Sequence, residues 1–166
     1  MDVTSPSSLE LLRTYGAILD ELRRRDVLRS ANSPISDVAE VLFCRAFGWK
    51  RAGGSAAGYD ATDASGTRFQ IKARRITRGT GGRQLSAIRN LDREPFDHLA
   101  AVLFKSDFTV YRAAVIPISV VKQRVRRSEH TNSHVLHLRD DIWLESGVAD
   151  ATEAICTEAA ALQASP

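Results

Sequence analysis

The sequence lacks most features of secreted, disulfide-bonded or membrane proteins. It has only two cysteines, Cys44 and Cys156, which lie far apart, so we expect two reduced thiols in a cytoplasmic protein. No apolar run reaches the roughly 18 residues that a membrane helix needs. The first residues also lack the basic and apolar segments of a secretory signal. These absences favour a soluble cytoplasmic protein with no membrane partner.

Several common chemical motifs are also missing. The glycine-containing segment 54–58 (GSAAG) is not followed by the Lys-Ser/Thr pair of a nucleotide-binding loop. His130, His134 and His137 lie close together, but no cysteine or acidic residue completes a recognisable zinc spacing. No Ser-His-Asp or Cys-His arrangement can be recognised, because such triads are defined by geometry rather than by order in the chain.

The composition is that of one ordinary soluble domain. The chain has 166 residues, of which 43% are hydrophobic and 26% are charged, enough to bury a core of its own. We therefore expect a single domain over residues 1–166. No internal repeat or low-complexity segment divides it.

Hydrophobic periodicity predicts helices alternating with strands. The expected elements are a helix over 8–29, a helix over 34–47 ended by Gly48, a hairpin over 58–75, strands over 98–104 and 108–118, a short basic helix over 119–127, a strand and turn over 134–143, and a helix over 150–163. This order predicts an α/β or α+β fold in which helices flank a mixed central sheet.

Positive charge is concentrated in one part of the chain. Residues 68–93 contain eight lysines and arginines and one acidic residue, Asp92, so their net charge is +7. The whole chain carries only +3, which leaves −4 for the remainder. A basic segment of this kind indicates a polyanionic partner such as nucleic acid, although a solvated arginine-rich loop has the same composition.

The hairpin GYDATDASGTRFQIKARR, residues 58–75, begins this basic segment. A three-residue loop, 64–66, places Gly66 where a positive φ is needed and pairs Ala61 with Phe69. Asp60 then lies opposite Gln70. Alternation along the strands puts the apolar side chains on a core face and the polar ones on the other face.

The polar face of this hairpin collects groups that could hold a metal ion. Asp60 supplies a carboxylate, Gln70 an amide oxygen and Ile71 a backbone carbonyl, which suits the oxygen shell of Mg²⁺ completed by water. Lys72 has no acceptor while charged, but its ammonium group can stabilise charge on a phosphate or hold a water molecule. The alternative is an ordinary hairpin with a solvated polar face.

Together these residues resemble the PD-(D/E)XK nuclease superfamily, which has the restriction-endonuclease-like fold. The resemblance rests on Glu40 in the second helix, on GYD at 58–60 and on QIK at 70–72, and it covers roughly residues 34–118. It implies an α/β fold with an αβββαβ core, placed at about residues 34–145, and a mixed central sheet flanked by helices.

The resemblance also implies a role for each site residue. Asp60 would be the central metal ligand, with Gln70, the carbonyl of Ile71 and Glu40 as further ligands, and Lys72 would be the catalytic lysine. Mg²⁺ is the implied metal, with Mn²⁺ as a substitute. Gln70 departs from the usual Glu or Asp, although branches that resemble the Mrr-type restriction endonucleases accept glutamine here. Glu40 is also consistent with an ordinary exposed helix residue.

The implied activity is metal-dependent hydrolysis of DNA by an endonuclease of restriction or defence type. A homodimer is one arrangement that would cut both strands. The expected contacts to DNA phosphates are Arg68, Arg74, Arg75, Arg78, Arg83 and Arg89. The alternative function is a catalytically inactive nuclease-fold domain that binds nucleic acid or a protein partner. A repair or RNA nuclease would differ only in its substrate.

Overall fold

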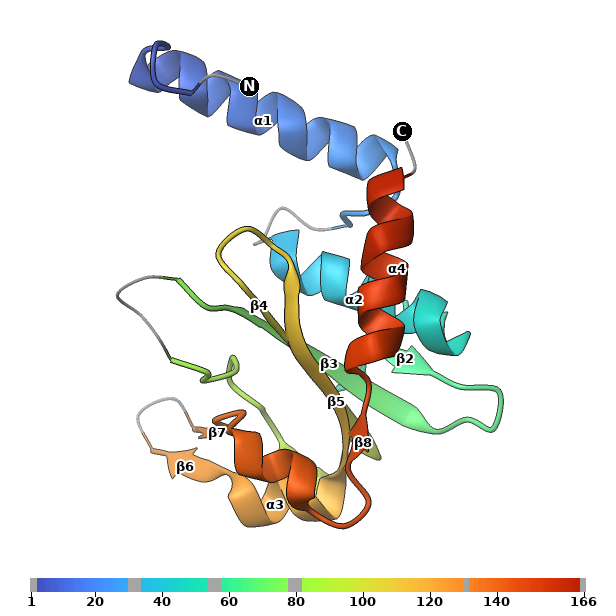
Figure 1. Ribbon diagram of the computed structural model, residues 1–166. Coiled ribbons are helices and arrows are strands. Elements are labelled where there is room, and N and C mark those ends of the chain that lie inside the picture. Colours follow the sequence, from blue (N-terminus) through green and yellow to red (C-terminus); the bar gives the residue numbers. More distant parts are fainter. Residues whose placement is uncertain (1–2, 30–33, 54–57, 78–81, 130–131, 165–166) are drawn as a thin grey trace.

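The protein has a mixed α/β architecture, as the sequence predicts. A computed structural model describes residues 3–29, 34–53, 58–77, 82–129 and 132–164. It contains a six-stranded mixed sheet with helices on both faces (Figure 1). Arg78, a predicted DNA contact, and His130, for which no zinc spacing was found, lie outside the described residues. Within the described residues, no helix is both long enough and apolar enough to cross a membrane.

The sheet is built around one parallel pair of strands. β3 and β4 run parallel, and every other neighbouring pair is antiparallel. In spatial order the strands are β1 (Lys50–Arg51), β2 (Ala61–Thr62), β3 (Arg68–Arg75), β4 (His98–Phe104), β5 (Val110–Pro117) and β8 (Ala149–Asp150). The bounds of β4 match the prediction. All of its residues after His98 are buried, as expected of a central strand.

The helices divide between the two faces of the sheet. They are α1 (Ser8–Arg24), α2 (Pro34–Phe47), α3 (Ile118–Arg124) and α4 (Thr152–Ala164). α2 and α4 cover one face together (Figure 1). The opposite face is covered by α3, by residues 85–96 with the 3-10 turn Leu91–Arg93, and by the 3-10 helix Asp140–Leu144. A separate hairpin joins β6 (Arg126–Ser128) to β7 (Ser133–Val135).

The hairpin register agrees with the prediction. Ala61 pairs with Phe69, and the N–H of Asp63 donates to the carbonyl of Thr67. Gly66 has φ +88° and closes the loop. The apolar residues therefore face α2, because a slip of one residue would expose Phe69 to water.

The end of α2 also follows its sequence signal. Gly48 adopts φ +66°, and the N–H of Trp49 donates to the carbonyl of Cys44 at 3.0 Å. This bond satisfies a carbonyl that the helix end leaves without a hydrogen-bond partner.

The two cysteines are free, and burial raises the pKa of the Cys44 thiol to about 11.

Two predicted helix ends were wrong. α1 ends at Arg24 instead of residue 29, where the chain turns through Asp26 with φ +59°. The basic helix over 119–127 ends at Arg124, because Val125 is extended (φ −76°, ψ 152°) and starts the chain toward β6. None of the residues of α1 is buried, and this helix extends away from the sheet (Figure 1).

Candidate metal site and nucleic-acid surface

The polar face of β3 lies at an edge that the neighbouring strand covers only in part. β2 is only two residues long and pairs with Arg68 and Phe69, so among the described strands none continues along that edge. Asp60 directly precedes β2. Its Oδ2 accepts the backbone N–H of Ile71 at 2.7 Å, which fixes the carboxylate against the open edge.

The carbonyl of Ile71 points toward the same edge. The carbonyl of Phe69 accepts the N–H of Asp60 at 2.8 Å, so it faces β2. Residues two apart in a strand repeat their orientation, so the Ile71 carbonyl also faces this edge. The Asp60 carboxylate and the Ile71 carbonyl are thus both directed to this edge of β3.

Gln70 is the most unusual residue of the site. Its side chain is buried, with 8% of the residue exposed. Its Nε2 donates to the carbonyl of Gly58 at 3.2 Å, whereas its Oε1 is buried and has no hydrogen-bond partner among the described residues. An unpaired buried acceptor costs about 1–3 kcal/mol in general. A ligand that fills this acceptor would remove that penalty.

Gly58 explains how the amide of Gln70 is oriented. Gly58 has φ +97°, and a Cβ at this position would lie 2.4 Å from the Cβ of Pro95. Only glycine fits, and the close approach to Pro95 holds its carbonyl beside Gln70. Sequence analysis missed this role, although a glycine two residues before a candidate ligand is a signal that could have indicated it.

Lys72 follows Gln70 on the same face of β3 and is half-buried. Burial lowers the pKa of its ammonium group, the charge of Arg89 lowers it further, and the charge of Asp60 acts in the opposite direction. Lys72 takes part in none of the ion pairs among the described residues. Its cation therefore remains available to a ligand.

The pKa of Asp60 is shifted in the opposite direction from that of Lys72. Burial raises the pKa of its carboxyl group, while the hydrogen bond from Ile71 and the charges of Lys72 and Arg51 oppose that rise. Both charged groups are poorly hydrated, and each lies within electrostatic reach of the other. Such paired perturbations are more frequent at functional sites than elsewhere on a protein.

Glu40 is near the site but is already engaged. Its Oε2 accepts the guanidinium of Arg51 at 2.7 Å, and Asp37 lies 3.8 Å from the same group. Burial raises the pKa of Glu40, and the charge of Asp60 contributes to the rise. The negative charge of Glu40 therefore acts on the groups of the site, but its carboxylate could bind a metal directly only after releasing Arg51.

The predicted DNA-binding arginines fall into two groups. Arg89 is exposed and close enough to Lys72 to affect its pKa, and Arg74 has a buried Nε without a hydrogen-bond partner. Three others already have partners in the protein: Arg68 pairs with Asp97, Arg83 pairs with Asp140, and Arg75 stacks over Phe108.

The described residues contain no cluster of metal-binding side chains, at the candidate site or elsewhere. No group of three or more histidine, cysteine, aspartate or glutamate side chains could hold a metal ion in that part of the chain. A metal beside Asp60 would therefore need the amide of Gln70, the carbonyl of Ile71 and water. Comparison with known proteins does not identify a family, since neither a protein-family model nor a curated protein matches the chain.

Replacing Lys72 by methionine should stabilise the protein. Because burial lowers the pKa of Lys72, the unfolded chain binds more protons than the folded chain between the lowered pKa and the ordinary one. Stability therefore falls as the pH drops through that window, and the penalty is present below it. Lys72→Met removes this penalty, so we expect the melting temperature to rise by a few degrees at pH 7.

Thermal unfolding measured from pH 7 to 10.5 checks this expectation. The gain should shrink as the pH approaches the ordinary lysine pKa of about 10.4, where the wild-type lysine also becomes neutral. The matched control is Lys105→Met at an exposed turn, which should leave the melting temperature unchanged. An unchanged or lower melting temperature for Lys72→Met at pH 7 contradicts the electrostatic description of the site.

Proposed function

We propose that this protein is a metal-dependent DNA endonuclease that hydrolyses phosphodiester bonds with Mg²⁺, or with Mn²⁺ as a substitute. The observation that carries the proposal is the buried Oε1 of Gln70, which has no hydrogen-bond partner among the described residues, on the strand whose Ile71 N–H holds the carboxylate of Asp60. With the carbonyl of Ile71, these groups would offer three oxygen ligands. Oxygen donors supplemented by water suit Mg²⁺.

The residues fit such an ion in a specific way. Asp60 supplies the negative charge, and Gln70 and Ile71 supply neutral oxygens. Glu40 would contribute through a water molecule while Arg51 holds its carboxylate. When bound, the ion supplies Lewis acidity at the scissile phosphate.

The protein's own groups would perform the remaining work. Lys72 would donate hydrogen bonds to a non-bridging phosphate oxygen, or orient the attacking water, and stabilise the charge that grows at phosphorus. Its poor hydration strengthens this interaction, because fewer water molecules screen the charge. Arg89 adds positive charge next to Lys72 and would hold a neighbouring phosphate.

The resemblance to PD-(D/E)XK nucleases supports the same proposal. α2 carries Glu40, Asp60 directly precedes β2, and β3 carries Gln70 and Lys72, which is the order of that family's motif. The αβββαβ core has an α-helix after its third strand. The described part of the crossover between β3 and β4 contains a 3-10 turn and no α-helix, so this core remains a proposal. A restriction or defence role, a cytoplasmic location and a homodimer belong to the proposal in the same way.

The second candidate is an inactive nuclease-fold domain that binds nucleic acid or a protein partner. Two observations favour it. Gln70 has no charge to offset that of a metal ion, and the carboxylate of Glu40 already forms an ion pair with Arg51. A repair or RNA nuclease shares the proposed chemistry and differs in the substrate alone. Cleavage and metal binding separate these possibilities.

Lys72→Ala should abolish most of the cleavage of supercoiled plasmid DNA. Loss of a group that stabilises the transition state lowers the rate about 10²–10³-fold. Gel analysis of nicked and linear DNA in Mg²⁺, with EDTA as the metal-free control, measures the effect. Lys105→Ala should cut like the wild type, because this lysine lies in an exposed turn away from the site. Equal cleavage by wild type and Lys72→Ala eliminates Lys72 as a catalytic residue.

Gln70→Glu should bind Mg²⁺ about tenfold more tightly than the wild type. A carboxylate offsets the charge of the ion, whereas an amide does not. Isothermal titration calorimetry measures both affinities, and Asp60→Asn serves as the variant that should lose binding. If Gln70→Glu gains no affinity, Gln70 does not contact the metal. A wild-type protein that binds Mg²⁺ but cuts no nucleic acid supports the inactive-domain alternative.

A further inference from the structure

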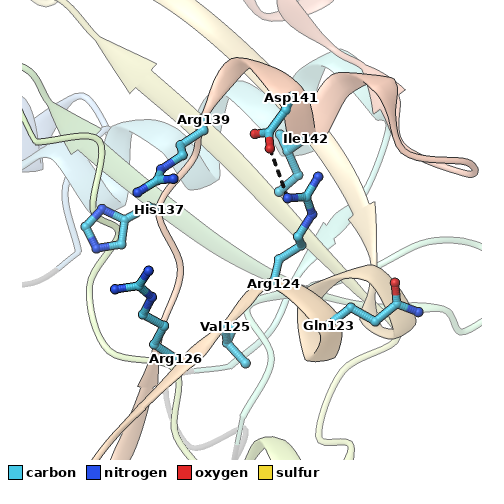
Figure 2. A pocket seen from close by; sticks show the side chains of 8 residues that line it. All are labelled: Gln123, Arg124, Val125, Arg126, His137, Arg139, Asp141 and Ile142. Carbon is cyan, nitrogen blue, oxygen red and sulfur yellow. Dashed lines mark hydrogen bonds and ion pairs between the residues drawn. The ribbon is translucent and has the colours of Figure 1, made fainter.

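A pocket lies between the end of α3 and the residues that follow β7. This pocket encloses about 280 Å³ and is lined by Gln123, Arg124, Val125, Arg126, His137, Arg139, Asp141 and Ile142. Figure 2 shows that the side chains of Arg126, Arg139 and His137 gather on one side of it, whereas Gln123 points away. The sequence analysis assigned no function to these arginines.

The backbone explains why these side chains meet. Val125 breaks the helix and directs the chain into β6, which pairs Arg126 with Val135. The chain leaving β7 then forms a backbone bridge between His137 and Gln84. This path brings residues 137–139 next to the start of β6, so two distant segments supply the basic groups.

The arginines that line the pocket differ in whether acidic residues pair with them. Arg124 donates to Asp141 at 2.9 Å and also to Glu145, so these three groups together carry a charge of −1. Arg126 and Arg139 are exposed and enter none of the ion pairs among the described residues. Two cationic side chains and the imidazole of His137 thus face one hollow without an acidic partner.

We propose that this pocket binds a phosphate group of a nucleic-acid strand, at a distance from the cleavage site. A guanidinium group presents its N–H donors in a plane that matches phosphate oxygens, and two of them offset a dianionic or a paired phosphate. The volume is at the lower end for ligand pockets, which suits a phosphate and its sugar.

Basic groups outside the pocket favour a strand over a free phosphate compound. Arg89 lies near Lys72, and the adjacent Ile88 bridges to His134 in β7. Arg127 in β6 lines a further hollow together with Arg93 and Asp92. Basic side chains are therefore present on the segments that connect the candidate cleavage site with the β6–β7 hairpin.

The identity of the bound strand rests on the proposed function, but its binding does not depend on cleavage. DNA affinity is therefore measured in EDTA by fluorescence anisotropy, with labelled single-stranded and double-stranded oligonucleotides over a range of salt concentrations. The double variant Arg126→Gln with Arg139→Gln removes the two uncompensated charges. The matched control is Arg13→Gln with Arg45→Gln, two exposed arginines on α1 and α2.

The pocket variant should bind DNA about tenfold more weakly than the wild type. The slope of log affinity against log salt should decrease by about 0.7–0.9 for each phosphate that the variant no longer binds, or up to about 1.8 in total. The control should keep both the affinity and the slope. Because the substituted side chains are exposed, all variants should have the wild-type melting temperature. If the pocket variant melts at a lower temperature, His137→Gln is measured in its place.

Three results overturn the proposal. One is a pocket variant with unchanged DNA affinity and slope. Another is an equal loss in the control, which would reflect net charge alone. The third is calorimetric binding of inorganic phosphate that the pocket variant loses while its DNA affinity stays unchanged, since the pocket would then serve a free phosphate compound. If DNA binding depends on the pocket but the wild type cuts no DNA, the pocket proposal stands and the endonuclease proposal fails.

Discussion

The parallel pairing of β3 with β4 fixes which side chains of β3 enter the core and which reach the candidate site. Because β4 is buried on both faces, its neighbour is held in one register, with Phe69 opposite His98. Phe69 and Ile71 then pack toward α2, and the polar residues between and after them turn to the other face. The candidate site depends on this register, because a shift by one residue would move Gln70 into the apolar core.

This arrangement stores free energy at the site. Asp60 and Lys72 are both partly buried, and the Oε1 of Gln70 has no hydrogen-bond partner in the described part of the chain. A protein selected only for stability would replace such groups with apolar ones, as buried charges rarely add net stability. Their presence at one open strand edge is most simply explained by a ligand that compensates all three. The pocket near β6, proposed to bind a phosphate, extends the same electrostatic pattern to a second position, because Arg126 and Arg139 have no ion-pair partner among the described residues.

Local sequence signals predicted much of the fold and part of the site. Alternation and Gly66 were sufficient for the hairpin register, and the continuous apolar run identified β4 as a central strand. The sequence could not reveal that β3 and β4 are parallel, because a crossover leaves no periodic signal in the residues it joins. It also could not reveal that Gly58 orients Gln70 or that Arg51 holds Glu40, since both contacts depend on tertiary packing. For the same reason the predicted DNA contacts all came from one basic segment, residues 68–93, while the pocket near β6 draws on segments far apart in the chain.

The most direct test of this account is anomalous X-ray diffraction from crystals of the protein soaked in Mn²⁺. The account predicts an anomalous peak in contact with a carboxylate oxygen of Asp60, the Oε1 of Gln70 and the carbonyl oxygen of Ile71. Crystals of Asp60→Asn should lose this peak. Fully soaked wild-type crystals that show no peak at this edge, or show Mn²⁺ bound only elsewhere, would contradict the central claim that these three oxygens form a metal site.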